Sequence, residues 1–378
     1  MNKSLPNIGQ KIKGFLKLDL QHNRVYGLDI LRAIAILFVL VQHSKYILPI
    51  KITHFINLIY FDGVGIFFVL SGFLIGGILI KIIHNKGFNH KLLFGFWKRR
   101  WFRTLPAYYL VLFLNLILAL FSNPNFKILV FPKYLIFSQN ILTNPPDFFS
   151  ESWSITIEEW FYAFVPILLF IFVQLFKFKT KNSILAIAVL IMFLGTIIRY
   201  YRFVHFGLNL ELSIISRFDN IMYGVLGAFF YFYYQKNWFK YRIQFFILGI
   251  ILHLLNKILI DFATIPIYEN VFSYSVFATA TLFLIPYLSS VKKGSGVIFK
   301  AITYTSLISY SMYLLNFSLI YYWIIKKIDL TTALHHNYNL ILPIKFILFW
   351  FLTFLFSLLL YKYFELPMTN LRDRKKVL

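Results

Sequence analysis

Apolar stretches of about 20 residues recur along the whole chain, and they constrain the fold more than any other feature. A segment of that length crosses the hydrocarbon core of a bilayer as an α-helix. The sequence therefore predicts an all-α polytopic membrane helix bundle of about ten transmembrane helices. We place the ten segments at roughly 28–48, 58–82, 105–122, 157–176, 183–203, 218–235, 243–260, 271–290, 307–325 and 342–362.

The composition excludes a soluble globular domain. Of the 378 residues, 59% are hydrophobic and 14% are charged, against roughly 45–50% and about 25% in soluble proteins. Lys and Arg number 38 and Asp and Glu 14, but the basic residues lie between the apolar segments. They therefore indicate contact with a lipid bilayer and its topology, and we expect no nucleic-acid partner. Because the chain has no cysteine, disulfides and thiolate metal sites are excluded.

The basic residues also predict an orientation. With both termini in the cytoplasm, 26 of the 38 Lys and Arg residues fall on the cytoplasmic side. We expect a basic cytoplasmic segment at 1–24, a transmembrane domain at 25–364 and a basic cytoplasmic tail at 365–378. The apolar stretch 126–142 is interrupted by Pro132 and is expected to form an external or re-entrant loop.

Two ionisable residues lie within the first apolar segment. Arg32 and His43 are 11 residues apart, which places them about 20° apart around a helix and about 16 Å apart along it. Ionisable groups inside a span are functional candidates, and a polar stripe on one helix face fits a water-filled cavity. The alternative is that both side chains extend to opposite membrane interfaces.

The second and third segments carry further candidates. Small residues let membrane helices approach closely, so we expect Gly72, Gly76 and Gly77 to pack against another helix. Ser71 beside them can bond to backbone or to a ligand. Before the third segment, Arg100 and Arg103 are one helical turn apart and can face the same way. Such a pair suits phosphate binding, although a topology signal alone also explains it.

The fourth segment opens with Ser154 and Glu158. Ser154 can cap the helix, and Glu158 lies one residue outside the spacing of a capping box. A capping role alone is one interpretation. The other places the Glu158 carboxylate at the depth of His43, where it can orient the imidazole and match its charge.

Together these segments resemble the membrane-bound acyltransferase 3 family, the envelope saccharide O-acyltransferases, over about residues 26–374. Each motif is weak alone, and seven occur in the family's order. They are Arg-x10-His at Arg32 and His43, FFxxSGF at 67–73, Arg-x-x-Arg-x-x-Pro at Arg100, Arg103 and Pro106, Trp-Ser-x-x-x-Glu at Trp153, Ser154 and Glu158, an Arg/Asp segment at Arg217 and Asp219, a Tyr-Leu-Leu segment at 309–315, and Glu-Leu-Pro at 365–367.

The resemblance implies a multi-pass enzyme of the bacterial inner membrane. It implies transfer of an acyl group, commonly acetyl, from cytoplasmic acyl-CoA to a hydroxyl of an envelope or exported saccharide. The acceptor would be a lipopolysaccharide, capsule or exopolysaccharide unit. Acyl-CoA is then the donor substrate, and no permanently bound cofactor is expected. The implied roles are general base for His43 with support from Glu158, acyl-CoA binding for Arg32, Arg100 and Arg103, and substrate binding for Ser71, Trp153, Ser154 and Asp219. Direct transfer and a relay through an acyl-histidine at His43 both remain open.

Two positions depart from the family pattern. Gly65 stands where relatives often have an acid, and Asn316 stands where they often have a histidine. Because an asparagine cannot carry a proton, we expect no catalytic role for Asn316. The adjacent His335 and His336 lack a spaced carboxylate, so no metal site is predicted.

Two other classes of protein fit parts of the pattern. A transporter or flippase of lipid-linked saccharides suits ten spans and an intramembrane arginine, and it predicts inverted repeats. We find no convincing internal repeat. A membrane scaffold without catalysis leaves the placement of Arg32, His43 and Glu158 unexplained.

Overall fold

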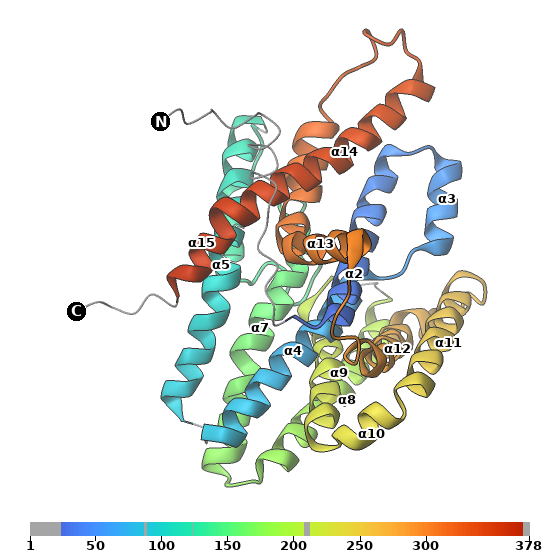
Figure 1. Ribbon diagram of the computed structural model, residues 1–378. Coiled ribbons are helices and arrows are strands. Elements are labelled where there is room, and N and C mark those ends of the chain that lie inside the picture. The colour runs from blue at the N-terminus through green and yellow to red at the C-terminus, as the bar shows by residue number, and fades with distance from the viewer. Residues whose placement is uncertain (1–23, 87–88, 123, 208–211, 373–378) are drawn as a thin grey trace, which may run out of the picture.

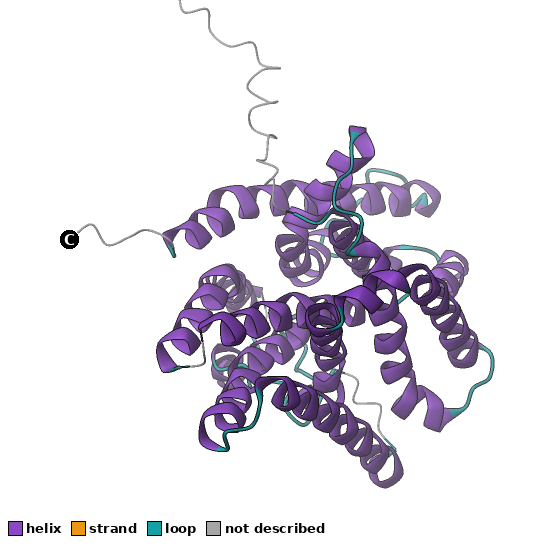
Figure 2. Cartoon of the chain, turned by 60° about the horizontal axis from the view of Figure 1, so that its bottom comes forward, coloured by secondary structure: helices purple, strands orange, loops and turns teal. Residues whose placement is uncertain are grey.

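The computed structural model describes residues 24–86, 89–122, 124–207 and 212–372, and within these residues every regular element is helical (Figures 1 and 2). The predicted segment 1–24 and the end of the predicted tail lie almost wholly outside the described residues. The helices are α2 (Tyr26–Ser44), α3 (Ile50–Ile59), α4 (Gly63–Lys86), α5 (His90–Ser122), α6 (Phe131–Leu135), α7 (Ser152–Phe170), α8 (Thr180–Phe206), α9 (Ile214–Tyr233), α10 (Gln235–Lys240), α11 (Arg242–Asp261), α12 (Ser273–Leu288), α13 (Gly296–Leu315), α14 (Tyr338–Leu360) and α15 (Leu366–Leu371). Short 3-10 or π segments are η1 (Lys45–Ile47), η2 (Ile128–Val130), η3 (Ile171–Leu175), η4 (Tyr268–Phe272), η5 (Asn316–Ile325) and η6 (Tyr361–Glu365).

Among the described residues, 9 helical segments are long and apolar enough to cross a membrane. They correspond to nine of the ten predicted spans. The exception is the predicted span 218–235, which forms α9 but is not among the nine. The reason is local, because Arg217, Asp219 and Asn220 lower the hydropathy of the first turns of α9, and all three side chains are buried.

The helix α2 lies between two apolar cores, and α13, α4 and α12 all pack against it (Figure 1). Leu28, Leu31 and Ala35 join the core that contains α4, α7, α8, α9 and α12. Ile36 and Leu40 join the second core, with α5, α13 and α14. A helix that is apolar on several faces is buried among others, as expected for a central element. Its polar side chains are therefore held inside the bundle.

The helices α4 and α9 cross at very short distance. A Cβ atom placed on Gly72 would lie 1.9 Å from the Ile221 carbonyl oxygen, and one placed on Gly224 would lie 1.9 Å from the Val69 carbonyl oxygen. Only glycine allows the two backbones to approach this closely. The packing role predicted for Gly72 is thus confirmed. For Gly77 it is wrong, because a Cβ there would meet nothing within 4 Å.

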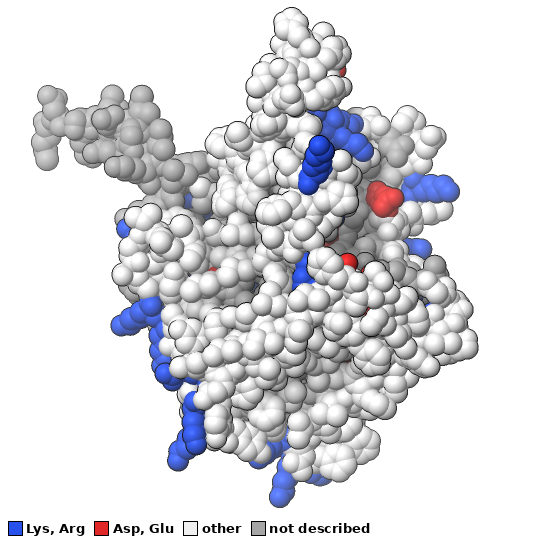
Figure 3. All heavy atoms as spheres, turned by 90° about the vertical axis from the view of Figure 1, so that its right-hand side faces the viewer, with Lys and Arg blue, Asp and Glu red and all other residues white. Residues whose placement is uncertain are grey.

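The stretch 126–142 forms η2 and α6 and folds against α5. The hydroxyl of Tyr108 donates to the Tyr134 carbonyl at 2.9 Å, and that of Tyr109 to the Leu135 carbonyl at 2.9 Å. On the face shown in Figure 3, many Lys and Arg atoms lie along the lower left edge, at the bottom and in the upper part, and the broad area between them shows few charged atoms. That pattern is typical of a protein whose sides contact lipid.

Candidate active site

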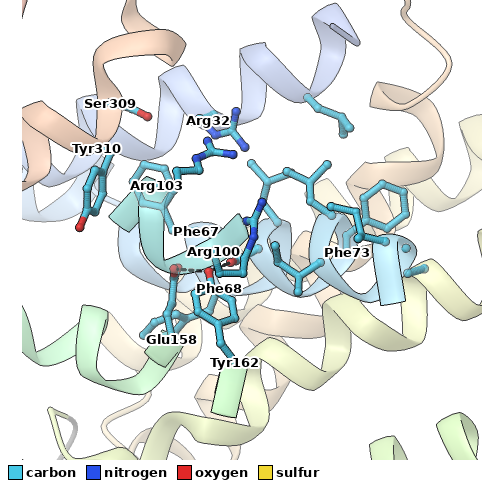
Figure 4. A pocket seen from close by; sticks show the side chains of 18 of the residues that line it. Arg32, Phe67, Phe68, Phe73, Arg100, Arg103, Glu158, Tyr162, Ser309 and Tyr310 are labelled. Atoms are coloured by element: carbon cyan, nitrogen blue, oxygen red, sulfur yellow. Dashed lines mark hydrogen bonds between the residues drawn. The ribbon is translucent and has the colours of Figure 1, made fainter. Parts of the chain in front are cut away.

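A cavity of about 520 Å³ lies inside the bundle (Figure 4). Charged or hydroxyl-bearing side chains line it from α2, α4, α5, α7, α9 and α13. Cationic side chains converge on it from α2, α4 and α5, whereas its far wall is built from aromatic and aliphatic groups. The cationic lining residues are Arg24, Arg32, Lys81, Arg100 and Arg103, and the acidic ones are Asp29 and Glu158. This excess of positive charge suits an anionic ligand that also carries an apolar part.

One arginine of α2, Arg32, faces the cavity and forms only a long ion pair with a carboxylate. Asp29 is buried and accepts a hydrogen bond from Arg24 Nε at 2.9 Å and another from Ser306 Oγ at 2.8 Å. The nearest guanidinium nitrogen of Arg32 lies 3.9 Å from the same carboxylate. Asp29 is therefore occupied mainly by Arg24 and Ser306, and Arg32 retains donors that point into the cavity (Figure 4).

Arg100 and Arg103 both line the cavity from α5, as their spacing predicts. Glu158 of α7 interacts electrostatically with both arginines and accepts a hydrogen bond from the Tyr162 hydroxyl at 2.7 Å. Ser71 of α4 lies 3.0 Å from the same hydroxyl. These groups form one polar wall, and the two arginines outnumber its single carboxylate.

His43 lies at the opposite end of α2 from Arg24, outside the cavity lining. Its Nδ1 atom is hydrogen-bonded to Oδ1 of Asn316, at the junction of α13 and η5. The amide nitrogen of Asn316 donates to the Met312 and Tyr313 carbonyls at 2.9 Å each. Because these two carbonyls accept only from the nitrogen, the amide oxygen must face His43.

The Asn316 contact sets the tautomer of His43. An amide oxygen has no proton to give, so Nδ1 of His43 must be the donor. In the neutral imidazole the proton is then on Nδ1, and Nε2 keeps its lone pair. Asn316 therefore orients the His43 ring with the lone pair on Nε2. The structure does not bring Glu158 and His43 together, since Glu158 pairs with Tyr162.

Ser154 and Tyr313 connect the cavity with the His43 region. Both line the cavity, and Ser154 Oγ donates to the Tyr313 hydroxyl at 2.7 Å. Tyr313 precedes Asn316 by three residues, so one turn of helix separates the cavity wall from the partner of His43. The helix α7 begins at Ser152 without a side-chain cap, so the capping interpretation of Ser154 is wrong.

Two other predicted substrate-binding residues lie outside the cavity lining. Asp219 is fully buried and bound by Arg199, with contacts of 2.7 and 2.9 Å to its two oxygens. Trp153 packs edge-to-face on Phe68 with the ring centroids 5.8 Å apart, and the Arg217 guanidinium lies 5.7 Å from its ring centroid. Phe68 lines the cavity, so Trp153 supports its wall from behind.

The described residues contain no group of three His, Asp or Glu side chains that could hold a metal ion. The sequence singles out Asn316 as a departure from the family pattern, but its contact with His43 was not predicted. The available signal was that a polar amide inside an apolar span needs a hydrogen-bond partner. The sequence could not say that this partner is His43.

The chain matches the acyltransferase domain of the acyltransferase 3 family over residues 25–362, and it belongs to that family. No solved structure matches it.

Three bacterial relatives illustrate the family. The Staphylococcus aureus (strain COL) protein named "Putative O-acetyltransferase" is 29% identical over 239 residues, covering 58% of this chain and 37% of the relative. "Putative peptidoglycan O-acetyltransferase YrhL" of Bacillus subtilis is 33% identical over 187 residues, covering 44% of this chain and 27% of the relative. "O-acetyltransferase OatA" of Staphylococcus aureus (strain NCTC 8325) is 29% identical over 197 residues, covering 46% of this chain and 29% of the relative. The matched regions thus span well under half the length of these relatives.

Proposed function

We propose that this protein transfers an acyl group, first of all acetyl, from cytoplasmic acyl-CoA to a hydroxyl of an envelope saccharide in the bacterial inner membrane. The observation that carries the proposal is that one helix, α2, presents Arg32 to the cationic cavity and His43 to Asn316. Membership of the acyltransferase 3 family and the names of the relatives support the same chemistry.

The donor would bind in the cavity. Its phosphates are matched by Arg100, Arg103 and Arg32, since guanidinium groups bind phosphate through two parallel hydrogen bonds. The apolar wall around Phe67 and Phe68 suits the uncharged arm that carries the thioester. Extension of this arm past Ser154 and Tyr313 would bring the acyl group to His43.

His43 would act as general base. Its Nε2 takes the proton of the acceptor hydroxyl while the hydroxyl oxygen bonds to the thioester carbonyl carbon. The carbon–sulfur bond then breaks, and the proton passes from Nε2 to the departing thiolate, which leaves as CoA. Asn316 holds the ring and keeps the proton on Nδ1 throughout the reaction. From the sequence, we expected Glu158 to orient the ring. Glu158 remains in the proposal as the carboxylate that orders Tyr162 and the two arginines of the donor site.

The acceptor would reach His43 from the outer membrane face. A peptidoglycan unit is suggested by the name of one relative, and lipopolysaccharide, capsule and exopolysaccharide units are the other candidates. The test is release of CoA from acetyl-CoA by purified protein in nanodiscs, with each saccharide class added in turn. We expect release that rises with one acceptor class. Folded protein that neither binds nor consumes acyl-CoA would contradict the proposal and favour the transport of lipid-linked saccharides.

A further inference from the structure

A second buried carboxylate lies next to the His43 region and has no role in the proposed reaction. Glu151 directly precedes α7 and is 3% exposed. Its Oε1 accepts hydrogen bonds from the backbone N–H of Ser318 at 2.9 Å and from the Ser318 hydroxyl. Within the described part of the chain, its Oε2 is buried without a hydrogen-bond partner.

The contact falls where the helix changes from α13 to the π-helical η5. In a π-helix the N–H at position 318 would pair with the carbonyl five residues earlier, that of Tyr313. That carbonyl accepts from the side chain of Asn316. The N–H of Ser318 donates to Glu151, which thus supplies an acceptor at this change of helix type. An unpaired buried N–H is costly, so the carboxylate stabilises this irregular turn.

The backbone of Glu151 is tied to the same region. The hydroxyl of Tyr313 donates to the Glu151 carbonyl at 2.7 Å. Glu151 thus holds the chain on both sides of Asn316, at Tyr313 through its backbone and at Ser318 through its side chain. Asn316 is the residue whose Oδ1 accepts the hydrogen bond from Nδ1 of His43.

We propose that Glu151 is a positioning residue for acyl transfer, which fixes the turn 316–318 so that Asn316 can hold His43 in its reactive tautomer. This inference rests on the proposed function and concerns only the general base of that reaction, His43. Loss of Glu151 would leave the donor cavity intact, because Glu151 does not line it. Its effect is therefore on turnover rather than on acyl-CoA binding.

The experiment is a double-mutant cycle on turnover in nanodiscs, with rates expressed per folded protein. Glu151→Leu is expected to lower kcat about 10- to 100-fold, since misplacement of a reacting group by about 1 Å has an effect of that size. KM for acetyl-CoA should change less than about twofold. In an Asn316→Ala background the same change should cost less than about threefold, because the turn then has nothing left to position.

Glu365→Leu is the matched control. Glu365 is a buried glutamate that accepts from Ser311 of the same helix, α13, at 2.7 Å and does not touch the turn 316–318. The change in turnover caused by Glu365→Leu should be the same in the wild-type and the Asn316→Ala backgrounds. Equal losses from Glu151→Leu in both backgrounds, or the same coupling for Glu365, would overturn the inference.

Two further variants test the inference if Glu151→Leu fails to fold. Glu151→Gln keeps an oxygen acceptor for Ser318 and should recover most of the turnover. Ser318→Ala removes one donor and should lose turnover only when Asn316 is present; loss in both backgrounds would overturn the inference.

A readout without turnover separates this inference from the proposed function. The ring ¹⁵N signals of His43, assigned by their absence in His43→Ala, report its tautomer. We expect the Nδ1–H form in the wild type and a mixture in Glu151→Leu. An unchanged tautomer in active protein would overturn the inference alone. Wild-type protein that consumes no acyl-CoA would overturn the proposed function on which the inference rests.

Discussion

The imidazole of His43 and the amide of Asn316, 273 residues apart in the sequence, form a hydrogen bond that joins the end of α2 to the end of α13. Two carbonyl contacts fix the amide so that only its oxygen can face the ring. The pair leaves the lone pair of His43 on Nε2, the atom that would remove a proton from a hydroxyl in the proposed reaction.

Asn316→Ala is expected to lower kcat for acyl transfer about 10- to 100-fold, because His43 then loses the acceptor that selects its tautomer and orientation. KM for acetyl-CoA should stay within about twofold of the wild type. The control is Asn256→Ala, which removes another buried amide, one that accepts from Tyr268 at 2.6 Å. If both variants lost the same turnover, the amide at 316 would have no special role.

Arg100→Ala and Arg103→Ala should each weaken acyl-CoA binding about 10- to 100-fold, the range expected when a charge-assisted hydrogen bond is lost. The cause is the loss of phosphate contacts, so kcat at saturating donor should fall far less. Binding is measured by calorimetry with CoA. Arg99→Ala is the matched control, because Arg99 is exposed and does not line the cavity. An equal effect of all three variants would point to general surface charge.

Asp219→Ala tests whether Asp219 contacts substrate or only Arg199. Removal of one partner of a buried ion pair costs about 3–5 kcal/mol, because the other charge is left uncompensated. We expect a lower yield of folded protein and a lower apparent Tm. The double variant Arg199→Met with Asp219→Leu should recover part of that loss. A well-folded Asp219→Ala protein with a raised KM for acceptor would instead assign Asp219 to the substrate.

Gly72→Ala is expected to destabilise the protein, since its Cβ would lie 1.9 Å from the Ile221 carbonyl oxygen and force α4 and α9 apart. The readout is the apparent Tm in detergent. Gly77→Ala, five residues along the same helix, adds a Cβ with nothing within 4 Å and should leave Tm unchanged. Similar Tm values for the two variants would contradict the close crossing.

The spans could be predicted from the sequence because burial in lipid demands long apolar helices, and that demand is visible residue by residue. The predicted span 218–235 shows the limit of this signal. Arg217 and Asp219 make α9 polar, and their burial depends on Asp62 and Arg199, which come from other parts of the chain.

The candidate site also has features that the sequence predicts and features that it does not. Arg100 and Arg103 of α5 share a cavity as their helical spacing predicts, because neighbours on one helix keep their geometry. Arg32 joins them from α2, which this spacing does not predict. The partner of His43 could not be predicted, since Glu158 and Asn316 were both polar groups in separate helices. Only the packing of α13 against α2 decides between them.

The most direct test of the central claim compares His43→Ala with His253→Ala in an assay of acyl transfer from radiolabelled acetyl-CoA. His253 is the matched control, a partly buried histidine of α11 that lies 3.3 Å from Thr281 and outside the cavity. The account predicts that His43→Ala stays folded, still binds CoA, and loses acyl transfer at least about 100-fold, in the range expected for a general base. His253→Ala should keep wild-type turnover. Transfer at the wild-type rate by His43→Ala would contradict the account.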